Sequence, residues 1–121
     1  MLCCGDTFLT GDDDDDLHLW IAITPPTNGE VITVSVTTQR KGSEALVVLH
    51  EGDHPFIKHD SVIAYIYSRI RTVASIEAAL LSGTAKQREP VSAGVLKRVQ
   101  DGLLDSNFTP NGVRFYYKNL K

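Results

Sequence analysis

Apolar residues in the first two thirds of the chain recur in short stretches that turn residues separate. In the clearest stretch, EVITVSVTT at residues 30–38, valine and isoleucine alternate with threonine and serine. A period of two is typical of a β-strand whose two faces differ in burial. β-Branched and aromatic content predicts further strands at residues 6–10, 17–24, 45–50 and 61–67.

The hydrophobic period changes toward the C-terminus. SAGVLKRVQDGLLD, residues 92–105, carries valine and leucine at helical spacing and predicts an amphipathic helix with Ser92 as its N-cap. Gly94 and Gly102 each weaken such a helix by roughly 1 kcal/mol relative to alanine, so packing must hold it.

Three other segments have weaker patterns. Residues 75–82 fit either a strand end or a short helix, and residues 83–92 fit a polar loop. In the tail, Pro-Asn-Gly predicts a turn, and VRFYY predicts a short final strand with Phe115 and Tyr117 against the core. Alternatively, the bases and aromatic residues of RFYYK, residues 114–118, could hold single-stranded RNA.

These elements predict one domain over residues 1–121, a small β-barrel or curled sheet with a helix packed against it. No apolar run reaches the ~18 residues of a membrane span, so no membrane association is expected. The N-terminal MLCCGD lacks the basic and apolar segments of a signal peptide, which favours a cytoplasmic protein. Cys3 and Cys4 are too few for a disulfide framework.

Charge is distributed unevenly along the chain. Residues 1–60 carry eleven acidic and three basic residues, whereas residues 61–121 carry four acidic and nine basic residues. The weak net charge of −3 therefore does not exclude an anionic partner. Phosphate contacts are expected in the C-terminal half or at the Arg40–Lys41 pair.

Several motifs, in this order, resemble the MazF/PemK-like toxins of type II toxin–antitoxin systems. The resemblance covers about residues 5–105 and leaves residues 106–121 as a C-terminal extension. The segments that carry it are Gly5–Asp6, LHLWIAITPP, ITVSVTTQRKG, ALVVLHEGD, SVIAYIYSRIRTV and SAGVLKRVQDGLL. It implies an SH3-like barrel that acts as a metal-independent endoribonuclease on single-stranded RNA, forms a homodimer and is neutralised by a cognate antitoxin.

The resemblance places the family's catalytic hydroxyl residue at Thr37, with Thr38 beside it. The family usually has Arg-Pro at the entrance of its second strand, where the arginine serves cleavage. This chain has His18–Leu19 there. The departure leaves an alternative open, a non-catalytic SH3-like barrel that binds a protein or nucleic acid.

Cleavage of RNA by its own 2′-hydroxyl needs a base, an acid and donors to the phosphate oxygens. Histidine titrates near neutral pH, so His18 could serve as base or acid. Thr37 could donate to a phosphate oxygen, and Arg40 or Lys41 could neutralise its charge. Alternatively, His18 is a surface strand residue and the two threonines only reflect β-propensity.

Arg69 and Arg71 lie two residues apart, on one face of a predicted strand end. They could form a further phosphate-binding patch, or they could pair with acidic residues of the first half.

Candidate metal ligands are dense in HEGDHPFIKHDS, residues 50–61, which contains His50, His54 and His59. Such a density of ligands could hold zinc or another divalent ion, but the spacing matches no standard metal site, so neither a metal nor a cofactor is predicted. The alternatives are a polar loop or one auxiliary acid–base group near the RNA groove.

Five consecutive aspartates, Asp12–Asp16, precede the second predicted strand. Three roles are open: a solubilising loop, a gate that occupies the basic residues until RNA displaces it, and a binding site for a basic partner.

Overall fold

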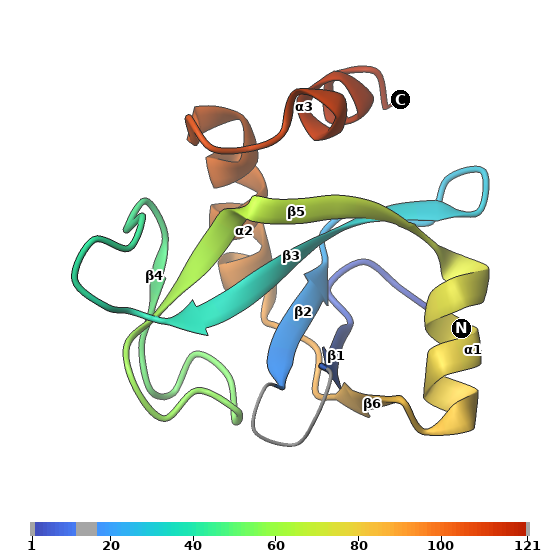
Figure 1. The fold of residues 1–121 in the computed structure, drawn as a ribbon, viewed down its shortest axis with the longest axis horizontal. Coiled ribbons are helices and arrows are strands. Elements are labelled where there is room, and N and C mark those ends of the chain that lie inside the picture. Colours follow the sequence, from blue (N-terminus) through green and yellow to red (C-terminus); the bar gives the residue numbers. More distant parts are fainter. Residues whose placement is uncertain (1, 12–16, 121) are drawn as a thin grey trace.

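The computed structural model describes residues 2–11 and 17–120 (Figure 1). Within them the chain forms a mainly β fold with three helices. The strands are β1 (Thr7–Thr10), β2 (His18–Ala22), β3 (Glu30–Thr38), β4 (Val48–Leu49), β5 (Ser61–Thr72) and β6 (Ala85–Arg88). The helices are α1 (Val73–Ser82), α2 (Ala93–Asp105) and α3 (Asn111–Lys118).

The strands make one antiparallel sheet in the order β4-β5-β3-β2-β1-β6. The sheet curls into a half-barrel, so the predicted class of a small β-barrel or curled sheet is confirmed at this level (Figure 1). No helix in the described part of the chain is long and apolar enough to cross a lipid bilayer.

Two hydrophobic clusters cover opposite faces of the sheet. The larger cluster joins alternate residues of the central strands to Val95, Val99 and Leu103 of α2. The smaller cluster lies on the other face, where Ile76 of α1 packs near Phe8. Because α1 covers only part of that second face, polar residues of β3 can line the rest of it.

A tight hairpin, with the sequence Pro-Pro-Thr-Asn-Gly, joins β2 to β3. Asn28 and Gly29 both have positive φ, 51° and 77°, which is the signature of a type I′ turn. Thr27 and Glu30 close it with two backbone hydrogen bonds of 3.0 Å. This turn sets the register between the two strands that carry the predicted catalytic residues.

The amphipathic helix at residues 92–105 is confirmed as α2. The Oγ of Ser92 accepts a hydrogen bond of 3.2 Å from the backbone N–H of Val95, as expected of an N-cap. Gly102 has a role that its helix propensity does not suggest. A Cβ at Gly102 would lie 2.9 Å from Cζ of Tyr65, so glycine allows this helix to approach β5 closely.

The predicted final strand is wrong, because residues 111–118 form the helix α3. Val113, Tyr116 and Tyr117 face the core at helical spacing, and Phe115 is 72% exposed. The expectation that Phe115 packs in the core is therefore also wrong. Three successive aromatic residues fit both the strand period and the helix period. Packing of the chain end against the larger core selects the helix.

The predicted polar loop at residues 83–92 contains the edge strand β6, which pairs with β1. Only Ala85 of β6 is buried, so this strand lacks the apolar alternation that would reveal it. Residues 75–82, which fit either a strand end or a short helix by sequence, belong to the helix α1. The hydroxyl of Thr72 caps its N-terminus, and Gly83 with φ 86° ends it.

Candidate functional site

Polar side chains gather at one end of the sheet, where β2 begins and β3 ends. Leu19 pairs with Val36 in the antiparallel β2–β3 ladder. One step further along this register, His18 lies beside Thr37. Directly opposed residues of an antiparallel pair point to the same face, so the imidazole and the hydroxyl share one side of the sheet.

His18 and Thr37 line one cavity of about 510 Å³, together with Thr38 and Arg40. The loop before β5 closes the cavity with Lys58 and His59. Four residues selected from the sequence therefore meet at one place. The cavity carries two cationic side chains and two imidazoles, which suits a phosphate group.

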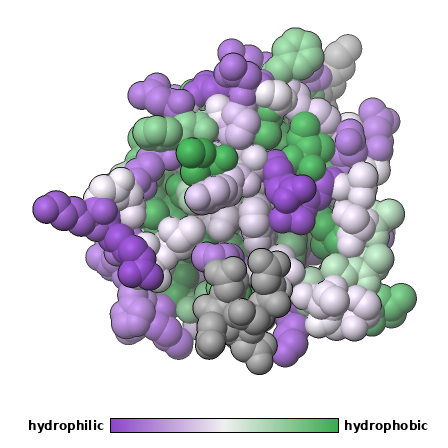
Figure 2. All heavy atoms as spheres, in the orientation of Figure 1, coloured by the Kyte–Doolittle hydropathy of each residue, from purple (hydrophilic) through white to green (hydrophobic). Residues whose placement is uncertain are grey.

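Lys41 borders a second hollow that continues from the first. Thr38, Arg40 and His59 line both hollows, and Lys41 and Asp60 line only the second. The loop of residues 39–47 that carries Lys41 protrudes at the left in Figure 1, and Figure 2 shows hydrophilic residues extending there. Lys41 thus extends the positive charge of the cavity outward, toward solvent.

Arg69 and Arg71 lie apart from this cavity, near the other end of β3. Arg69 pairs with Thr33 and Arg71 pairs with Val31, so both arginines share the face of Thr37. Thr33 is four residues from Thr37 along β3, which places Arg69 about 13 Å from Thr37 and Arg71 farther away. Within residues 2–11 and 17–120, neither arginine forms an ion pair with a carboxylate.

Arg71 is fixed in place by two contacts. Its guanidinium carbon lies 4.4 Å from the centroid of the Trp20 ring, a cation–π contact, and its Nε donates to Oγ1 of Thr33 at 3.2 Å. Burial, and then the charge of Arg69, lower the pKa of Arg71. It remains a guanidinium cation at neutral pH because the unperturbed pKa of arginine is so high.

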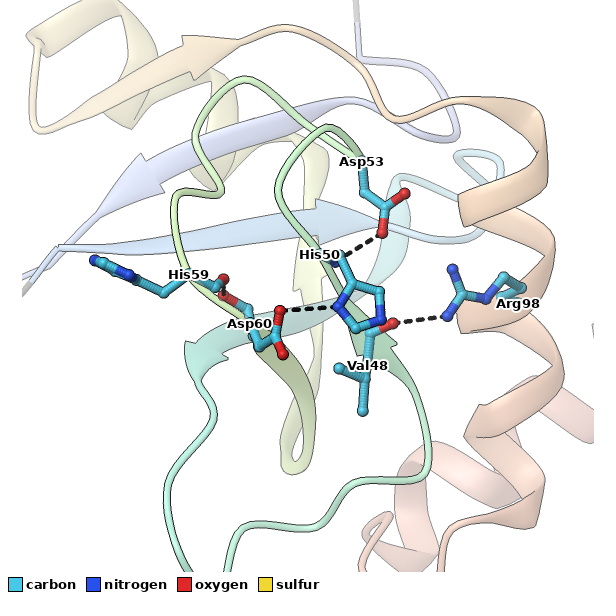
Figure 3. A network of polar contacts seen from close by, with 7 residues as sticks. Val48, His50, Asp53, His59, Asp60 and Arg98 are labelled. Carbon is cyan, nitrogen blue, oxygen red and sulfur yellow. Dashed lines mark hydrogen bonds and ion pairs between the residues drawn. The ribbon is translucent and has the colours of Figure 1, made fainter.

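His50 and His59, both in the 50–60 loop, have separate surroundings (Figure 3). Nδ1 of His50 lies 2.8 Å from Oδ1 of Asp60, and the backbone N–H of His50 donates to Asp53 at 2.8 Å. The His59 side chain points away from this pair (Figure 3). It lines the cavity that His18 and Thr37 share. No three metal-ligating side chains of the described residues come together as a metal site.

His54 is buried, with only 3% of its surface exposed. Its Nδ1 accepts from the N–H of Phe56 at 3.0 Å, so its Nε2 carries the proton and donates to the carbonyl of Glu89 at 2.5 Å. His54 therefore joins the 50–60 loop to the segment before α2 and is shielded from solvent.

Replacing His54 by alanine is expected to lower the free energy of unfolding by about 2–3 kcal/mol, because the partly buried N–H of Phe56 loses its acceptor and a cavity opens. Urea denaturation measures this loss. His50→Ala is the control, since its contact with Asp60 is exposed and its loss costs at most ~1 kcal/mol. Equal stability of the two variants would contradict the structural role of His54.

The sequence does not single out Lys58, and it indicates His59 only as one of several loop residues that could ligate a metal or act as an auxiliary acid or base. Both lie in a loop that was considered for metal binding, and only the fold shows that this loop closes over the ends of β2 and β3. The aspartate run, Asp12–Asp16, lies outside the described residues, so its three possible roles stay open.

A comparison of the chain with protein-family models found no match, and a search of the curated proteins found none either.

Proposed function

We propose that this protein is a metal-independent endoribonuclease that cleaves single-stranded RNA, and that it is the toxin of a type II toxin–antitoxin pair with a MazF/PemK-like, SH3-like barrel. The observation that carries the proposal is the cavity that His18 and Thr37 share with Arg40, Lys58 and His59. The resemblance of motif order extends the proposal to a cytoplasmic homodimer and a cognate antitoxin.

Two imidazoles in one cavity supply the acid and the base that the reaction needs. One histidine, neutral, takes the proton of the 2′-hydroxyl as O2′ bonds to phosphorus. The other, protonated, gives a proton to the 5′-oxygen as the P–O5′ bond breaks. The products are a 2′,3′-cyclic phosphate and a 5′-hydroxyl, and neither water nor a metal takes part in this step.

Cationic and hydroxyl groups stabilise the charge that develops on the phosphorus oxygens. Arg40 and Lys58 line the same cavity as both imidazoles, and Thr37 offers its hydroxyl from the end of β3. His18 takes the place of the family's catalytic arginine in this arrangement, because Arg40 and Lys58 already supply fixed positive charge.

Arg69 and Arg71 extend the same face beyond the cavity. Fixed over Trp20, the guanidinium of Arg71 can hold a second phosphate of the strand while the cavity holds the scissile one. The wild-type protein is therefore expected to bind RNA less tightly as salt rises, because each phosphate contact releases counterions.

The test is cleavage of RNA by the purified wild-type protein and by Thr37→Val, with chelator present throughout. Wild type should yield 2′,3′-cyclic phosphate and 5′-hydroxyl ends, and Thr37→Val should cleave about 10²-fold more slowly or worse. Ends are mapped by sequencing, and binding of an uncleavable 2′-deoxy strand serves as the control. No cleavage by wild type, with binding intact, rejects the proposal.

That result would instead support the second candidate, a non-catalytic SH3-like barrel that binds protein or nucleic acid. The observation that favours this candidate is His18, which stands where the family carries its catalytic arginine. In a binding module, alanine at His18 would leave binding of the 2′-deoxy strand unchanged.

A further inference from the structure

A third hollow, of about 450 Å³, adjoins the catalytic cavity and shares Thr37 with it. Ala64, Ile66 and Tyr67 of β5 line one side, and Phe108 lines another side from the connection between α2 and α3. Glu44 and its neighbour Ser43 add polar atoms. The hollow therefore begins where the scissile phosphate would lie and continues along β5.

Its apolar side chains lie open to solvent. Ile66 is 54% exposed, Tyr67 is 63% exposed and Phe108 is 55% exposed. Figure 2 shows hydrophobic residues at the surface in this region, at the upper left, where β5 passes below the α2–α3 connection of Figure 1. Exposed aromatic surface beside a phosphate site is what stacks a nucleobase.

Glu44 is held in place at this hollow. Its Oε2 accepts a hydrogen bond of 2.5 Å from Oγ of Ser106. The chain before it is fixed by a turn, in which the N–H of Arg40 donates to Oγ of Ser43 at 2.9 Å. Within the described part of the chain Glu44 forms no ion pair, so its carboxylate keeps acceptor capacity toward the hollow.

We propose that this hollow is a nucleobase pocket, selective for guanine, for the nucleotide next to the scissile phosphate. Guanine alone presents two adjacent donors, N1–H and N2–H, on its Watson–Crick edge, and a carboxylate accepts both side by side. Tyr67 supplies the stacking surface and Glu44 the selectivity. The inference rests on the proposed ribonuclease activity.

Binding of single nucleotides tests the pocket without cleavage. The probes are guanosine, adenosine, cytidine and uridine 3′-monophosphates, titrated by calorimetry into the wild-type protein. Guanosine 3′-monophosphate should bind most tightly. Glu44→Gln, which keeps an amide to pair with Ser106, should lower that preference roughly 10- to 100-fold. Glu51→Gln, an acid outside the hollow, should keep it.

Tyr67→Ala should lower the binding affinity for all four nucleotides by about tenfold or more. The order of the four affinities should stay unchanged, because stacking is not base-selective. Phe115→Ala, which removes an exposed aromatic residue from α3, is the matched control. Two results overturn the proposal: no guanine preference in wild type, or a preference that Glu44→Gln leaves intact. Conversion of a wild-type dimer to monomers by Tyr67→Ala also overturns it and assigns the hollow to a second copy of the chain.

Mapped RNA ends separate this inference from the proposed function. Cleavage without guanosine enrichment beside the cut would support the ribonuclease activity and reject the guanine pocket. Guanine binding that depends on Glu44, without any cleavage, would support the guanine pocket and reject the ribonuclease activity.

Discussion

Replacing Gly102 by alanine will lower the free energy of unfolding by about 2–4 kcal/mol, although alanine is the better helix former. The new Cβ would clash with the Tyr65 hydroxyl and would lie 2.9 Å from both Cζ of Tyr65 and Cγ2 of Val47. Tyr65 cannot retreat, because it is fully buried and donates a hydrogen bond of 2.7 Å to the carbonyl of Val99. The helix or the strand must shift, and that hydrogen bond is strained or lost.

Gly94→Ala in the same helix is the matched control. A Cβ at Gly94 would meet no atom within 4 Å, so only helix propensity changes and stability should rise by up to ~1 kcal/mol. Urea denaturation of the two variants and the wild type gives the comparison. Equal effects of the two substitutions would show that α2 does not pack on Tyr65 as closely as described.

Alanine at His18 or at His59 will lower the rate of RNA cleavage by roughly 10²- to 10⁴-fold each, if the two imidazoles are the acid and the base. His50→Asn is the control, because the amide keeps a donor for Asp60 and the side chain lies outside the cavity. Single-turnover cleavage of one RNA by all four proteins is the measurement. Full activity of His59→Ala would remove this residue from the mechanism.

The same variants should change the dependence of cleavage on pH. In the wild type the rate should fall on both sides of an optimum, since one imidazole must be neutral and the other protonated. The charged groups around His59 in its two hollows are Arg40, Lys41, Lys58 and Asp60. Each alanine variant should lose one side of the profile, whereas a role limited to folding would lower the rate equally at every pH.

The strands were predictable from the sequence where β-branched residues alternate with polar residues. β3 shows this best, because its alternation indicates a strand and the side on which Thr37 lies, although residues 31–36 are buried on both faces. β6 was not predictable, because it is an edge strand with one buried residue and its pairing with β1 depends on the path of the whole chain. Residues 111–118 were misassigned because a short aromatic run fits both periods and only tertiary packing decides.

The candidate site was predictable in part for a similar reason. His18 and Thr37 lie on neighbouring strands that one hairpin turn connects. The local sequence at Asn28–Gly29 sets the register of these strands and so places the two side chains close together. Lys58 and His59 reach them from a distant loop, whose position depends on the buried hydrogen bonds of His54. Helix propensity alone gives the wrong expectation at Gly102. The glycine is needed there because it leaves room for the Tyr65 side chain.

The pairing of β1 with β6 has a consequence for synthesis on the ribosome. The strand made first, Thr7–Thr10, needs Ala85–Arg88 to cover its outer edge. Until those residues emerge, a nascent chain carries a row of unsatisfied backbone groups beside β1, open to any extended segment nearby. A fragment truncated before Ala85 would keep that exposed edge permanently and would be prone to aggregate.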